Sequence, residues 1–189
     1  MRPTTTTTSI RSNVMNQAKT TSITENSPYA YLERAEGIVI SKSNTCNGVG
    51  AQTDNLFTVT GCVKILEIWG VCTEATSVVT LSANSLALYD GAATAEITDS
   101  AAPTDLSAAF SVGDVLVKNG ASATVSLACL HNATGVVNDT IATPTYLLKK
   151  TAQTTYIQHL FTGDAATDAD ITWYVKYVAV TSDGVVTAV

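Results

Sequence analysis

Histidine and charged side chains are scarce in this chain. The 189 residues include two histidines, and Asp, Glu, Lys and Arg together make up 14% of the sequence, compared with about 25% in typical soluble domains. His131 stands at an expected strand end, and His159 follows strand alternation, so we expect ordinary structural positions for both. The serines form no GxSxG motif, and the glycines form no phosphate-binding loop. These absences predict a protein that is not an enzyme and has no catalytic residues.

Paired cysteines are missing as well. The four cysteines are widely spaced, with no CxxC pair and no histidine at the spacing of a zinc ligand. Three of them lie in strand-like runs, where a thiol behaves as a small apolar residue. We therefore expect free thiols, mostly buried, and neither disulfides nor a metal site. The four are Cys46, Cys62, Cys72 and Cys129.

One acidic loop deserves comparison with calcium sites. Asp164, Asp168 and Asp170 place three carboxylates close together, but the loop lacks the glycine and the distal glutamate of an EF-hand. Solvated acidic turns are the commoner origin of such a cluster. The sequence therefore predicts no bound metal and no cofactor.

Long apolar runs and clustered basic residues are also absent. No stretch approaches the roughly 20 apolar residues that cross a bilayer, and the N-terminus lacks the apolar region of a signal peptide. The formal charge is −6. The basic residues are too sparse to displace counterions from phosphates. We expect neither a membrane nor a nucleic acid as partner.

The N-terminal segment differs from the rest of the chain. Residues 1–36 form a Thr-rich arm that includes the run Thr4–Thr8 and shows neither a helical nor a strand period. Such a segment either stays without fixed structure or becomes ordered across a neighbouring subunit, because Thr favours extended backbone when a partner supplies hydrogen bonds. The sequence leaves both alternatives open.

From Gly37 onward the pattern is one of strands and turns. Phe57–Thr73 reads as the longest strand-like stretch, and its alternation slips near Ile65–Leu66, which indicates a bulge. Asn44–Thr53 reads as a loop. Phe110–Lys118 and Ala121–Leu130 flank Asn119-Gly120, which predicts a hairpin with a tight turn.

No segment shows the periodicity of an amphipathic helix. Many short strands joined by Gly, Asn and Asp turns predict an all-β protein whose residues 37–189 form one antiparallel β-sandwich or jelly-roll-like body, preceded by the extended arm. The low charge suits a body that packs against copies of itself.

The aromatic residues are the candidates for a contact surface. Trp173 and Tyr177 share one face of the strand Ile171–Val180, and Tyr174 takes the other. One face should therefore join the core and the other a subunit interface, although an aromatic platform for a carbohydrate is the competing interpretation. The candidate interface residues are Tyr29, Tyr31, Trp69, Trp173, Tyr174 and Tyr177.

Two segments carry a family resemblance. The C-terminal strand has a Trp-x-x-x-Tyr pattern, from Trp173 to Tyr177, and is followed by Asp183-Gly184 and the tail Val185–Val189. Gly61–Thr73 (GCVKILEIWGVCT) has the features Gly-x-Val-x-Ile and Gly-Val-x-Thr. These features, over about a sixth of the chain, resemble small structural proteins of tailed-bacteriophage virions.

The resemblance implies a capsid decoration or cement protein. Such a protein would be a homotrimer made in the host cytoplasm and bound to the major capsid protein on the surface of the virion. The alternative is a tail-fibre or adhesin-like module that binds a carbohydrate on the host surface. The resemblance supplies no catalytic residues.

Overall fold

The computed structural model describes residues 37–75, 81–106, 110–118, 125–130, 145–163 and 168–189, so the arm lies outside the described residues. Every regular element in this part of the chain is a β-strand. The strands are β1 (Ile38–Asn47), β2 (Gly50–Thr60), β3 (Cys62–Ala75), β4 (Ser82–Tyr89), β5 (Thr94–Glu96), β6 (Val115–Lys118), β7 (Leu127–Leu130), β8 (Thr145–Leu148), β9 (Thr155–Gly163), β10 (Asp168–Ala179) and β11 (Val185–Ala188).

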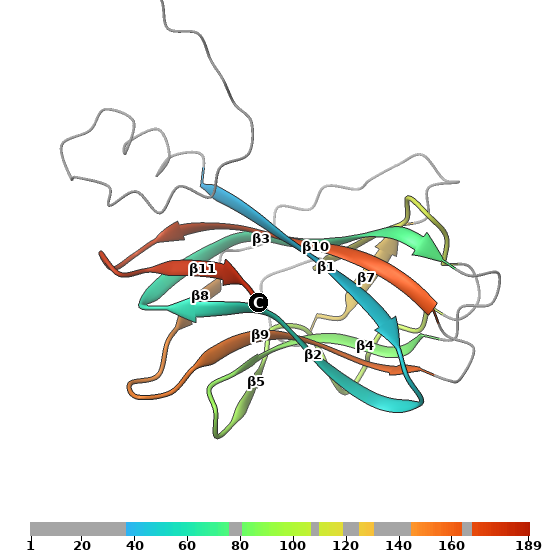
Figure 1. Cartoon of the computed structure of the whole chain (residues 1–189), viewed down its shortest axis with the longest axis horizontal. Helices are drawn as coiled ribbons and strands as arrows, with labels where there is room; N and C mark the ends of the chain where they lie inside the picture. The colour runs from blue at the N-terminus through green and yellow to red at the C-terminus, as the bar shows by residue number, and fades with distance from the viewer. Residues whose placement is uncertain (1–36, 76–80, 107–109, 119–124, 131–144, 164–167) are drawn as a thin grey trace, which may run out of the picture.

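The strands form two antiparallel sheets. The larger sheet has six strands in the order β1-β10-β3-β6-β7, with β8 also paired to β3, and the smaller sheet has five in the order β11-β2-β9-β4-β5. Figure 1 shows β1, β3 and β10 in one layer and β2, β4 and β9 in the other. The all-β, two-sheet prediction is confirmed.

The pairing is nested along the chain. β1 pairs with β10, β2 with β9, β3 with β8, and β4 with β5. Successive pairs fall in alternate sheets, which is the winding of a jelly roll. The β6–β7 hairpin extends the larger sheet beside the second half of β3. β11 adds a fifth strand to the smaller sheet, next to β2.

Alternation along each strand builds the core between the sheets. In β10 the residues Ile171, Trp173, Val175 and Tyr177 are buried, while those between them are partly exposed. Trp173 lies opposite Gly70 in the register, and a side chain at Gly70 would approach the indole ring to 3.0 Å. The glycine therefore makes room for the largest buried side chain.

The bulge predicted at Ile65–Leu66 is confirmed. Lys176 pairs with Glu67 whereas Tyr177 pairs with Ile65, so Leu66 is the extra residue in β3. The prediction of one continuous strand over Phe57–Thr73 is wrong. The first strand ends before Gly61, where the chain passes from the smaller sheet to the larger one. Gly61 has a φ of +61°, which favours glycine.

Two other local predictions need correction. The expected loop Asn44–Thr53 is largely strand, and Gly48-Val49 alone separates β1 from β2. The hairpin β6–β7 exists, but Lys118 pairs with Leu127, so the expected two-residue connection to a strand that begins at Ala121 is wrong. Asn119-Gly120 itself lies outside the described residues. The strands are shorter than the hairpin motif implied.

Candidate functional site

The outer face of the larger sheet is the candidate contact surface. At its centre Trp69 of β3 and Tyr174 of β10 occupy paired positions. Their rings stack with centroids 5.1 Å apart and planes within 6° of parallel. Both are half-buried. Solvated outer faces of antiparallel sheets usually carry polar residues, so a large aromatic pair at this position is unusual.

Apolar side chains extend the stack across the sheet. Val117 pairs with Trp69, and Val115 pairs with Val71, all with partial exposure. On the other side of the stack, the Lys176 Nζ lies 3.7 Å from the Glu67 Oε1. An exposed ion pair of this kind adds little to stability. The centre of the contact surface is therefore aromatic and aliphatic, with charge at its border.

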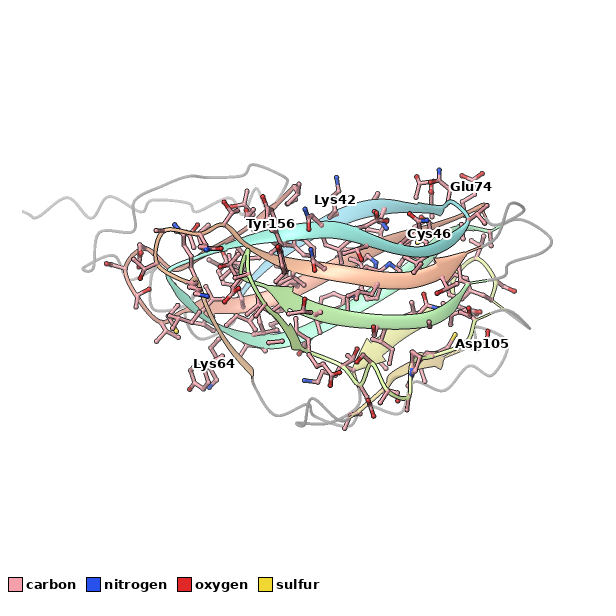
Figure 2. All side chains as sticks on the ribbon, turned by 90° about the horizontal axis from the view of Figure 1, so that it is seen from below. Lys42, Cys46, Lys64, Glu74, Asp105 and Tyr156 are labelled. Carbon is pink, nitrogen blue, oxygen red and sulfur yellow. The ribbon has the colours of Figure 1, made fainter. Side chains whose placement is uncertain are left out.

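One end of the same face is openly apolar. Tyr146 and Leu148 of β8 pair with Lys64 and Cys62 of β3, and each keeps 63% of its surface exposed. Val180, which follows β10, is 52% exposed. We call Cys62, Tyr146, Leu148, Val178 and Val180 the apolar end. The Lys64 Nζ lies 5.9 Å from the centroid of the Tyr146 ring, and Figure 2 shows Lys64 at the periphery of the body.

The structure separates the six candidate interface residues into three groups. Trp69 and Tyr174 lie together on the outer face. Trp173 and Tyr177 are 0% and 3% exposed, so they belong to the core and are unavailable to a partner. Their positions in the alternation of β10 turn them toward the smaller sheet. Tyr29 and Tyr31 lie outside the described residues.

A second cluster of interest is buried between the sheets around His159. The Nε2 atom of His159 lies 3.1 Å from the Oδ1 of Asn84, and its Nδ1 lies 3.9 Å from the Sγ of Cys46. All three side chains are fully buried. The imidazole also packs against Phe161 and Trp173. Cys, His and Asn in this order are the residue types of a thiol protease triad, so their chemical state matters.

A bulge in β4 brings Asn84 into this cluster. Ser82 pairs with Thr162 and Ser85 with Leu160, so β4 carries an extra residue at this point. Ala83 has a φ of +55°, which is strained for a side chain larger than glycine. The bulge turns the amide of Asn84 inward, where its Nδ2 donates to the carbonyls of Leu81 and Thr104.

These hydrogen bonds assign the protons of the cluster. Because the Asn84 Nδ2 already donates to two carbonyls, its Oδ1 is the acceptor, and the His159 Nε2 must carry a proton. The Nδ1 of His159 then accepts from the thiol of Cys46. Asn44, which stands two residues before Cys46 in β1, donates from its Nδ2 to Asp54 Oδ2 at 2.8 Å. Imidazole and thiol are both neutral in this arrangement.

The pKa values agree with that assignment. Burial lowers the pKa of His159 to about 3 and raises the pKa of Cys46 to about 12. A catalytic Cys–His pair needs the opposite shifts, toward thiolate and imidazolium, and a path to solvent. In this conformation the cluster can hold the two sheets together but cannot attack a substrate.

Thiol labelling tests this conclusion. In the native protein, Cys46 and Cys72 should resist N-ethylmaleimide because both are buried, whereas the half-buried Cys62 should react first. Peptide mapping by mass spectrometry after short labelling pulses measures each rate. All four should label quickly in denaturant. If Cys46 in the native protein reacts as fast as a solvent-exposed thiol, the cluster becomes a candidate nucleophilic site.

The acidic loop, His131 and the absence of membrane spans were the other subjects of prediction. No group of three His, Cys, Asp or Glu suited to a metal occurs among the described residues. Asp164 and His131 fall in gaps of the description, as does the side chain of Asp168. None of the ranges described contains a helix that is long and apolar enough to span a membrane.

Comparison of the chain with protein-family models, with curated proteins and with solved structures found no match. The features that bear on function are therefore the contact surface on the larger sheet and the cluster around His159.

Sequence reasoning missed the apolar end and the partners of His159. Tyr146 and Leu148 alternate with the buried Leu147, so an outward apolar pair was visible in the sequence once β8 was assigned. A histidine in the buried phase of a strand requires a polar partner, but the sequence could not say which. Asn84 reaches it only through the bulge at Ala83.

Proposed function

We propose that this protein is a structural component of a bacteriophage particle, a capsid decoration or cement protein that stabilises the head through contacts between subunits. The observation that carries the proposal is the outer face of the larger sheet, with the Trp69–Tyr174 stack at its centre and exposed apolar residues at one end. Contiguous apolar patches on a folded body indicate interaction surfaces.

The fold and the composition support the same proposal. Jelly rolls are common in viral capsid proteins, and lectins and many other proteins share the architecture. The low charged fraction of 14% suits a surface that is covered in an assembly. The sheets provide two rigid surfaces on which such contacts can be built.

The geometry of the stack disfavours the carbohydrate-binding alternative. Sugars bind on an exposed aromatic face, whereas Trp69 and Tyr174 each turn one face toward the other ring. One face of each ring is therefore covered by the other ring. The aliphatic neighbours Val115 and Val117 also suit a protein surface better than a pyranose ring.

Mass spectrometry of purified virions tests the proposal directly. A decoration protein should be present in tens to hundreds of copies per particle, on the scale of the major capsid protein. A few copies per particle would indicate a tail component instead. Absence from the virion, or specific binding on a glycan array, would overturn the proposal.

Substitution of Trp69 should weaken attachment to the particle. Trp69→Ser removes the half-exposed ring from the contact surface, and loss of a central aromatic anchor should lower capsid affinity at least tenfold. Co-sedimentation with undecorated capsids measures the change. Val185→Ser is the control, because Val185 is 44% exposed and lies in β11 of the smaller sheet. Equal losses for both variants would contradict the role of the stack.

A further inference from the structure

The free edge of β1 is the longest unpaired strand edge in the part of the chain that the structure describes. β1 lies at the border of the larger sheet and pairs, among the described strands, with β10 alone. It has ten residues, whereas the other strands at sheet borders, β5, β7, β8 and β11, have three or four. Every second residue of an antiparallel edge strand turns its N–H and C=O away from its neighbour, so β1 offers about five donor–acceptor pairs to a further strand.

β1 lacks most of the features that protect strand edges from pairing. Its register with β10 runs from Ile38 to Asn47 without a shift, so no bulge twists the edge away. The strand contains no proline. A long, regular and mostly uncharged edge is a template for strand addition. The side chains that it exposes are one valine and four small polar residues: Val39, Ser41, Ser43, Thr45 and Asn47.

Lys42 is the one charged residue of β1, and it determines which strand fits there. It lies on the inward side of the strand, together with Ile40 and Cys46, and is partly buried. It has no ion-pair partner among the described residues, and the carboxylate of Asp54 is held by the Asn44 Nδ2 at 2.8 Å. Figure 2 shows Lys42 at the upper border of the body. A strand added to β1 therefore places a side chain directly beside an ammonium group that lacks an acidic neighbour.

The neighbouring position on β10 has the same surplus of donors. Lys42 lies opposite Trp173 in the register, and the buried Nε1 of Trp173 has no hydrogen-bond partner. A β-carbon at Gly70 of β3 would meet Cε3 and Cζ3 of the indole, so the ring edge that carries Nε1 lies on the side of β1. A buried N–H without an acceptor is rare. The ammonium and the indole N–H therefore favour a partner that brings an acceptor to this position.

From these observations we propose that the free edge of β1 binds an extended segment of a partner protein, which adds as a further strand and places an aspartate or glutamate beside Lys42. The main chain of the segment supplies the hydrogen bonds of the sheet, and its carboxylate accepts from the ammonium group. Strand addition of this kind depends on the β1 edge alone. It can therefore be tested whether or not the protein belongs to a virion.

Charge argues against a second copy of β1 as the added strand. Two copies that pair antiparallel about a twofold axis, with their inward sides on the same face, place Lys42 opposite Ile40, Lys42 or Asn44 in the registers of fullest overlap. The two lysines are then directly opposite or diagonal neighbours, within about 8 Å of each other. Like charges in these positions destabilise the pair, whereas an acidic strand stabilises it.

Peptide binding to the full-length protein tests the proposed contact. The probe is a fluorescent synthetic peptide of alternating threonine and valine with a central glutamate, and the comparison peptide has lysine in place of the glutamate. Fluorescence anisotropy should show about tenfold tighter binding of the glutamate peptide, because the lysine peptide places like charges together. Lys42→Glu should reverse this preference. Lys149→Glu is the matched control, because it makes the same charge change at an exposed site outside β1 and should leave the preference unchanged.

Two results of this experiment would overturn strand addition beside Lys42. One is that neither peptide binds the wild-type protein. The other is a preference for glutamate that Lys42→Glu leaves unaltered.

N-methylated peptides test the main-chain pairing without changing the protein. Methylation at every second residue removes the N–H groups along one edge of the peptide, so of two glutamate peptides methylated at alternate positions one should lose binding and the other should keep it. Hydrogen exchange in the complex locates the added strand, because amides of β1 should exchange more slowly while those of the border strand β7 stay unchanged. Equal binding of the two methylated peptides, or new protection outside β1, would refute the contact. Full protection of the β1 amides before peptide is added would show an edge that is already occupied, and would refute it too.

Discussion

Replacing Gly61 by alanine should lower the free energy of unfolding by about 3 kcal/mol, through backbone strain and overpacking together. Gly61 turns the chain from β2 into β3 with a φ of +61°. A β-carbon at this position would lie 2.5 Å from Asp183 Oδ1, 2.6 Å from Thr181 Oγ1 and 2.8 Å from the backbone carbonyl carbon of Asp183. The last contact cannot be relieved by rotating a side chain.

The neighbourhood of Gly61 explains why the turn is so tight. The Cys62 N–H donates to Thr181 Oγ1 at 2.8 Å, and the Val180 N–H donates to the Cys62 carbonyl at 2.9 Å. The Lys149 N–H donates to the carbonyl of Gly61 itself. The turn thus ties the segment after β10 and the end of β8 to the crossing point between the sheets.

Gly50→Ala separates strain from packing. Gly50 also has a positive φ, +82°, but a β-carbon there would have no neighbour within 4 Å. Its replacement should lower stability by only about 1 kcal/mol, the conformational part of the effect. Urea unfolding of the two variants, followed by tryptophan fluorescence, measures the difference. Equal effects would show that the contacts at Gly61 relax freely.

Acid should destabilise the protein through His159. The pKa of this imidazole is about 3 in the folded state because of burial, against an ordinary value of 6.5. Between these values the unfolded chain binds a proton that the folded chain does not, so stability falls as the pH drops below 6.5. Each pH unit removes about 1.4 kcal/mol, which amounts to about 3 kcal/mol by pH 4.

Comparison with His159→Gln isolates this contribution. Glutamine keeps an N–H donor for Asn84 Oδ1 but does not titrate, so the variant should be less stable at pH 7 and lose less stability on acidification. The two slopes of unfolding free energy against pH should differ by about 1.4 kcal/mol per unit between pH 6 and 4. Carboxyl groups such as Asp90, whose pKa is lowered mainly by hydrogen bonds from the Ala93 and Ala92 N–H groups, act in both proteins. Parallel slopes would show that His159 is protonated in the folded state.

The class of fold could be predicted from the sequence because period-2 alternation is a local property. The slip at Leu66 was also visible, because an extra residue in a strand reverses the alternation wherever it occurs. The break at Gly61 was not. Phe57, Val59, Val63 and Ile65 share one parity, and both sheets face the same core, so a chain that changes sheets can keep its apolar phase.

The candidate site was predicted only in part, for a related reason. Alternation in β10 separated Trp173 from Tyr174 correctly, but it could not say which face is buried. That depends on the partner sheet. The stack of Tyr174 on Trp69 and the meeting of Cys46 with His159 both depend on register between strands far apart in the chain. The β6–β7 hairpin shows the same dependence, because Lys118 pairs with Leu127 rather than with a residue directly after Asn119-Gly120.

The nested pairing of the strands also determines the order of events during synthesis. β1 is the first described strand to leave the ribosome, yet among the described strands it pairs with β10 alone, which is made more than a hundred residues later. Until then the edge of β1 stays unpaired, and such long-range closure makes folding slow, on the scale of milliseconds to seconds. High expression should therefore favour aggregation of nascent chains, and holding chaperones should raise the yield of folded protein.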